Sequence, residues 1–145
     1  MEIGLIGIGA ALAIAAVGSA MGTGTAGMAA IGAWKKCFIE NRSAPFMLIA
    51  FVGAPLTQTI YGFILMNTLN DAVEAGADPG LILGAGVFGG LAMMFSAWFQ
   101  GRAGANASDA LAETGQGFGN FIMVIGIVET VALFVMVLLM GVVQA

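Results

Sequence analysis

Glu129 is an acidic residue in a segment that is otherwise uncharged. The segment runs from Phe118 to Val143, twenty-six residues, long enough to cross a bilayer as a helix. A carboxylate near the centre of such a span costs roughly 2.5–3.5 kcal/mol on insertion scales. Something must compensate for this cost, so Glu129 is the first candidate for chemistry. The competing interpretation is a structural acid that is paired inside a helix bundle.

Other polar side chains are expected at a similar depth. At a rise of about 1.5 Å per residue, Glu129 lies about 16 Å, Gln58 about 21 Å and Gln100 about 14 Å from the same membrane surface. Thr57 and Tyr61 are close to Gln58 in the sequence. The set offers a carboxylate, two amide carbonyls and hydroxyl oxygens, which suit a hard cation. Because one carboxylate would neutralise one monovalent cation, the pattern predicts a monovalent-cation site.

Pro55 lies just before this group and has no backbone N–H. The carbonyl of Phe51 therefore loses its helical partner, and we expect the helix to bend there. Each feature also has a simpler interpretation. Gln58 or Gln100 alone would serve as interhelical hydrogen-bond partners, and Thr57 alone would bond to its own helix. Their coincidence around one buried acid favours the ion site.

The composition is that of an integral membrane protein. Of 145 residues, 60% are hydrophobic and 8% are charged, and the mean hydropathy is +1.03. The chain has no His, and its one cysteine, Cys37, excludes an internal disulfide. The N-terminus lacks a basic n-region, so the first apolar stretch is expected to remain as a span. We expect no soluble domain and no nucleic-acid partner.

Four membrane helices in one membrane domain, residues 1–145, are predicted. They are expected at Ile3–Gly32, Ala44–Asn70, Gly80–Asp109 and Phe118 to the end. They pair as one hairpin over residues 1–72 and a second over 80–145. Short loops make sequence neighbours antiparallel.

Charges are distributed unequally among the expected loops. Lys35, Lys36 and Arg42 fall in the first loop, and Arg102 lies toward the third. The second loop is acidic. By the positive-inside rule, the first and third loops are cytoplasmic, and both termini and the second loop face outward. The protein is thus expected to be a multi-pass protein of the cell membrane.

Glycine divides the helices into two classes. The first contains eight glycines and the third seven, whereas the second and fourth contain two and three. Gly18 and Gly22, and likewise Gly80 and Gly84, have the spacing that lets helix backbones approach closely. We expect the first and third helices to form a tight inner layer. The second and fourth should face lipid.

The chain also contains an internal repeat. The segment from Ser19 to Gly27 aligns with that from Ser96 to Gly104, and Gln58 aligns with Glu129. The chain therefore reads as two copies of one hairpin with a single acid per four helices. The G-x-G-x-x-G pattern that begins at Gly22 lies inside a membrane helix and lacks the strand a dinucleotide site needs.

These features resemble the proteolipid (K, or c) subunit of V-type ATPases, especially the sodium-pumping bacterial kind. The resemblance covers almost the whole chain. Where that kind is expected to have Leu before the proline and Gly after it, this chain has Ala54 and Leu56. The resemblance is carried by the segments Pro55-Leu56-Thr57-Gln58-Thr59-Ile60-Tyr61-Gly62, Phe99-Gln100-Gly101-Arg102 and Val128-Glu129-Thr130.

The resemblance implies a ring of identical subunits that turns against a membrane stator and is attached to central-stalk subunits at its cytoplasmic loops. The subunit would not be an enzyme on its own; it would carry Na⁺ through the lipid during ATP-driven rotation. A proton-carrying ring, with H⁺ in place of Na⁺, is the alternative within the family. A small four-helix cation exporter and a structural four-helix protein are alternatives of other classes. The implied Na⁺ ligands are Glu129, Gln58, Gln100, Thr57 and the backbone carbonyl of Ala54, with Tyr61 hydrogen-bonded to the carboxylate.

Overall fold

Residues 2–145 are described by a computed structural model, and within this part of the chain all regular structure is helical. Four rods are long and apolar enough to cross a membrane. The fold is therefore the predicted all-α membrane fold. The rods comprise α1 (Glu2–Ile39), then α2 (Leu48–Gly53), η1 (Ala54–Leu56) and α3 (Thr57–Glu74) as one interrupted rod, then α4 (Pro79–Thr114) and α5 (Phe118–Val143).

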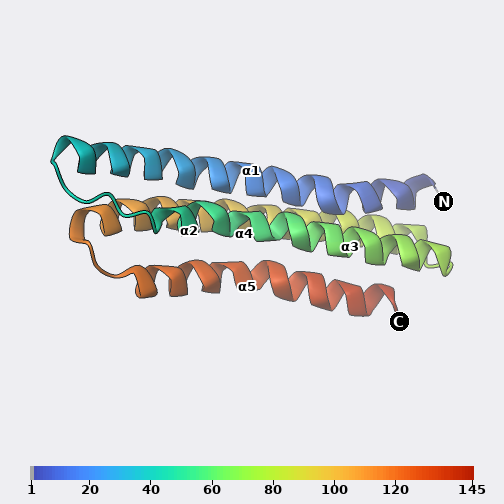
Figure 1. Cartoon of the computed structure of the whole chain (residues 1–145). Coiled ribbons are helices and arrows are strands. Elements are labelled where there is room, and N and C mark those ends of the chain that lie inside the picture. The colour runs from blue at the N-terminus through green and yellow to red at the C-terminus, as the bar shows by residue number, and fades with distance from the viewer. Residues whose placement is uncertain (1) are drawn as a thin grey trace.

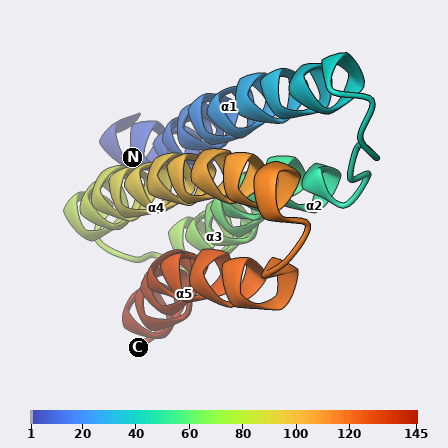
Figure 2. The ribbon, with the colours of Figure 1, turned by 90° about the vertical axis from the view of Figure 1, so that its left-hand side faces the viewer.

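The rods run roughly parallel or antiparallel to one another as a bundle of two hairpins (Figure 1). Both termini lie at one end of the bundle together with the α3–α4 loop, and the other two loops lie at the opposite end. The most extensive packing joins α1 to α4, and α3 contacts α1, α4 and α5. Seen from one end, α1 and α5 lie at opposite edges of the bundle (Figure 2).

Glycines bring the backbones of α1 and α4 together. A Cβ atom added at Gly86 would collide with the backbone of Gly7, and one added at Gly101 would collide with the backbone of Gly22. The close approach expected of the first and third helices, and the role of Gly22 in it, are thus confirmed. The expectation for Gly80 and Gly84 is wrong. A Cβ at Gly84 would meet nothing within 4 Å, because Gly84 lies on a side of α4 that is turned away from α1, whereas Ile82, Leu83 and Gly86 contact α1.

Most of the helices have different bounds from those predicted. α1 continues to Ile39, so Lys35 and Lys36 lie in its last turns and not in a loop. α4 continues to Thr114, and α3 reaches Glu74, which takes Asp71 and Glu74 out of the expected second loop. Hydropathy marks the stretch that fits the lipid, whereas the backbone hydrogen bonds of a helix extend beyond it.

The helix ends follow local chemistry. Asp78 caps the N-terminus of α4 by accepting a hydrogen bond from the Leu81 N–H at 2.9 Å, and Pro79 occupies the first turn. Gly115 ends α4 in the left-handed conformation, with φ of 67°. Arg42, from the α1–α2 loop, donates to the carbonyl of Ala112 at 2.7 Å. This contact ties the first hairpin to the C-terminus of α4, where the helix dipole favours a cation.

We predict that Gly86→Ala destabilises the bundle by about 1–3 kcal/mol, because the added methyl forces the α1 backbone away from α4. The matched control is Gly141→Ala on α5, where an added Cβ meets nothing within 4 Å. Titration of the detergent-solubilised protein with SDS, followed by circular dichroism, measures the difference. Equal stability of the two variants would contradict the tight α1–α4 contact.

Candidate cation-binding site

The Glu129 carboxylate on α5 is half-buried and receives hydrogen bonds from two other helices. Tyr61, on α3, donates its hydroxyl to Oε1 at 2.7 Å. Gln100, on α4, donates from Nε2 to Oε2 at 3.1 Å. Residues from three helices therefore meet at one carboxylate, as their similar positions along the predicted spans led us to expect.

Behind the carboxylate lies a pair of amide side chains without exposed surface. Gln58 and Gln100 are both fully buried. Gln58 donates from Nε2 to Oε1 of Gln100 at 2.8 Å, and Gln100 Nε2 also donates to the carbonyl of Ile125 at 3.2 Å. Because a buried amide is costly unless it is paired, this pair fixes the relative positions of α3, α4 and α5.

Ser96 completes the network and was not among the predicted site residues. Its hydroxyl accepts from Gln58 Nε2 at 3.3 Å and donates to the carbonyl of Val128 at 3.0 Å. One signal in the sequence pointed to it, since Ser96 precedes Gln100 by four residues and so shares its helix face. Its counterpart in the repeat, Ser19, is also buried, but its hydroxyl has no hydrogen-bond partner within the described residues.

Thr57 links the network to the backbone of the interrupted rod. Its hydroxyl lies 3.0 Å from the carbonyl oxygen of Ala54 and 3.2 Å from Oε1 of Gln58. The Ala54 carbonyl also accepts the N–H of Thr57, as a 3₁₀ turn requires. All six predicted site residues are therefore joined in one hydrogen-bonded chain that runs from Ala54 to Glu129.

Two glycines on neighbouring helices make room for the interruption at Pro55. A Cβ on Gly22 of α1 would stand 2.8 Å from Cβ of Pro55. A Cβ on Gly104 of α4 would stand 2.8 Å from the carbonyl oxygen of Phe51, the group whose helical partner Pro55 removes. At the position where Pro55 predicts a bend, the helix is interrupted by the 3₁₀ segment η1. Thr57 and Gln58 follow this segment directly, at the start of α3.

Glu129 is the acidic group of the site, and the side chains that contact its carboxylate, Tyr61 and Gln100, are neutral. Neither of the two ion pairs in residues 2–145 involves Glu129; they join Lys36 to Glu113 and Arg42 to Glu40. The Arg102 guanidinium lies 5.8 Å from the ring centroids of Trp98 and Phe99 on its own helix. Within residues 2–145 the partners of the Glu129 carboxylate are thus the neutral side chains of Tyr61 and Gln100, and no cationic group pairs with it. An acid surrounded by neutral oxygen-bearing groups has the capacity to exchange a cation.

The fold and the site define a multi-pass helical membrane protein with a carboxylate held at membrane depth by neutral donors. Residues 83–140, most of α4 and α5, match the family model of the ATP synthase C subunit. Gln100 and Glu129 both lie in the matched stretch. Comparison with curated proteins gives no match. The matched stretch, which is less than half of the chain, is similar to that family.

We predict that Ser96→Ala and Ser19→Ala, two changes related by the repeat, have different effects. The first leaves Gln58 with one acceptor fewer and costs about 1–3 kcal/mol of stability. The second removes a hydroxyl that has no partner and should be neutral or slightly stabilising. SDS titration of both variants measures this difference. Equal losses of stability would show that Ser96 is not part of a coupled network.

Proposed function

We propose that this protein is the Na⁺-carrying rotor subunit of a V-type ATPase. The proposal rests above all on the Glu129 carboxylate, which meets only neutral donors and is backed by two fully buried amides. A single carboxylate balances a single Na⁺, and the neutral pair crosses lipid at low cost. The duplicated hairpin with one acid per four helices, which resembles the V-type proteolipid, supports the choice of complex.

The proposed ligands are Glu129, Gln58, Gln100, Thr57 and the carbonyl of Ala54, with Tyr61 orienting the carboxylate. All of them come from one chain, so each subunit holds a whole site. Gln100 directs its NH₂ group toward Glu129 and its carbonyl toward Gln58. For Na⁺ to bind, Gln100 has to rotate its amide so that oxygen replaces nitrogen beside the carboxylate. Gln58 must then find a new acceptor, and Ser96 already accepts from it.

Rotation would carry the loaded site through lipid between two aqueous access routes on a stator subunit. A cation on the stator would release Na⁺ by pairing with the emptied carboxylate. Arg102 does not fit this role, because it lies on the same chain with its guanidinium beside Trp98 and Phe99. Moving one charge against 100 mV costs about 2.3 kcal/mol, so release has to be coupled tightly to rotation. The loops at 40–47 and 115–117 are the proposed attachment point of the central stalk.

We predict that Na⁺ slows the reaction of Glu129 with a hydrophobic carbodiimide. The reagent attacks the protonated acid, whereas bound Na⁺ holds the carboxylate ionised. Since protons and Na⁺ compete for one group, the apparent Na⁺ affinity should fall as the pH is lowered. The measurement is the rate of labelling in detergent at several pH values, with choline as the ionic-strength control. The Glu129→Gln variant should take up no label.

A labelling rate that follows pH and ignores Na⁺ would assign the protein to the proton-carrying alternative. A rate that ignores both would contradict an ion-carrying role for Glu129. Gln100→Ala separates these cases further, because it removes a proposed neutral ligand and leaves the acid. Its Na⁺ protection should be lost while its labelling still responds to pH.

The proposed membrane orientation places the α1–α2 and α4–α5 loops in the cytoplasm. The basic residues Lys35, Lys36, Arg42 and the acidic residues Asp71, Glu74, Asp78 gather at opposite ends of the bundle. In a Cys37→Ala background, we predict that Glu74→Cys reacts with an impermeant maleimide in sealed cells and that Glu40→Cys reacts only after permeabilisation. The reverse pattern would invert the orientation.

A further inference from the structure

The hydroxyl of Ser96 has a fixed hydrogen-bond polarity. It lies 3.0 Å from the backbone carbonyl oxygen of Val128, which can only accept, so its single hydrogen is committed there. Toward Gln58 the hydroxyl therefore presents lone pairs, and Nε2 of Gln58 donates to it at 3.3 Å. Ser96 itself is buried. A backbone group of α5 thus decides, through Ser96, which end of the Gln58 amide faces α4.

This polarity places the Gln58 carbonyl beside two other oxygens. Oε1 of Gln58 lies 3.2 Å from the Thr57 hydroxyl oxygen, which lies 3.0 Å from the carbonyl oxygen of Ala54. The three oxygens have one hydroxyl hydrogen between them, that of Thr57, so lone pairs remain for a cation. A reversed Gln58 amide would put its NH₂ group here and replace an oxygen ligand by a donor.

Gln100 is the amide that has to change when the proposed site is loaded. At present its Nε2 donates to Glu129 and its Oε1 accepts from Gln58 at 2.8 Å. When its carbonyl turns toward Na⁺, its NH₂ group meets the NH₂ group of Gln58 and that bond is lost. Gln58 then either reverses too and pairs with Gln100 again, or stays in place and relies on Ser96. The second outcome alone keeps the Gln58 carbonyl among the ligands.

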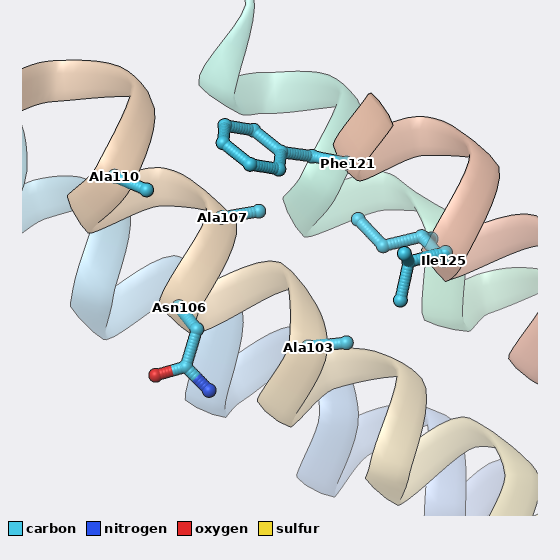
Figure 3. Close-up of a pocket in the computed structure, with 7 residues that line it drawn as sticks. Ala103, Asn106, Ala107, Ala110, Phe121 and Ile125 are labelled. Carbon is cyan, nitrogen blue, oxygen red and sulfur yellow. The ribbon is translucent and has the colours of Figure 1, made fainter. Parts of the chain in front are cut away.

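The groove beside the site offers no acceptor that could replace Ser96. It begins at Ile125, whose carbonyl accepts from Gln100 at 3.2 Å, and it has a volume of about 370 Å³ between α4 and α5 (Figure 3). Its polar side chain, Asn106, points away from α5 and donates to a carbonyl of its own helix at 3.2 Å. Within residues 2–145, Ser96 is therefore the acceptor that Gln58 Nε2 keeps when Gln100 turns.

We propose that Ser96 is a positioning residue that makes the site selective for Na⁺ over H⁺, because it holds the Gln58 carbonyl toward the cation while Gln100 reverses. The inference rests on the proposed Na⁺-carrying function and adds a residue that does not touch the ion. Protonation of Glu129 makes no such demand, since the proton adds to the carboxylate and needs no oxygen from Gln58. Loss of the Ser96 hydroxyl should therefore weaken Na⁺ binding and leave the proton response unchanged.

The test is Na⁺ protection of Glu129 from a hydrophobic carbodiimide in the full-length protein in mild detergent, with the label on Glu129 measured by mass spectrometry. In Ser96→Ala, the Na⁺ concentration that halves the labelling rate should rise about tenfold, because Gln58 loses its last acceptor in the loaded state. The pH dependence of labelling without Na⁺ should remain that of the wild type. Ser96→Thr keeps a hydroxyl and should restore most of the Na⁺ protection.

Two further variants separate the hydroxyl from packing. Ser108→Ala is the matched control, because this buried serine of α4 donates to the carbonyl of Gly104 in its own helix at 2.9 Å. It should leave both the Na⁺ and the pH response unchanged. Ser96→Cys fills nearly the same space with a weak acceptor, so it should behave like Ser96→Ala.

Unchanged Na⁺ protection in Ser96→Ala overturns the proposal. A parallel change in the pH response, or an equal shift in Ser108→Ala, also overturns it, because either result would show a general loss of packing. Wild-type labelling that follows pH and ignores Na⁺ is a different result: it refutes the proposed Na⁺-carrying function, and the role of Ser96 falls with it.

Discussion

A carboxylate at membrane depth needs hydrogen-bond donors or a cation around it, because lipid offers neither. Here the acid is on α5 and its donors, Tyr61 and Gln100, are on α3 and α4. The three helices must therefore hold one spacing at one level. Both donor helices are set against α1, since Gly62 of α3 lies against Ala15 and Gly101 of α4 against Gly22. Packing against the α1 backbone thus positions the helices of the site, although α1 contributes no side chain to it.

The interruption of the helix at Pro55 is the second structural condition for the site. A continuous helix would pair the Phe51 carbonyl internally and turn the following residues through regular helical steps. The 3₁₀ segment instead brings the Thr57 hydroxyl between the Ala54 carbonyl and Gln58. The interruption is accommodated because Gly22 and Gly104 leave room for Pro55 and for the freed carbonyl. Glycines on two neighbouring helices therefore act on the site through the backbone of a third.

The two hairpins have diverged where chemistry or packing differs between them. Glu129 has Gln58 as its counterpart, so a single acid serves four helices and the amide becomes part of that acid's surroundings. The Ser96 hydroxyl is hydrogen-bonded within the network, whereas the Ser19 hydroxyl is buried and has no partner among residues 2–145. Gly22 has Phe99 as its counterpart, which replaces a close backbone contact by a large exposed ring. The duplication thus keeps the architecture while its two halves take different roles.

The sequence alone determined the membrane class, the four spans, the interruption at Pro55 and the polar residues that meet at Glu129. These follow from hydropathy, from proline's missing N–H and from depth along a helix, all of which are local properties. The tertiary structure decided that Gly86 and Gly101, and not Gly80 and Gly84, contact α1, and that Ser96 joins the site. Those outcomes depend on how each helix is rotated about its axis. Helices that are apolar on every side have too little amphipathic periodicity to encode that rotation in the sequence, so only packing against neighbours fixes it.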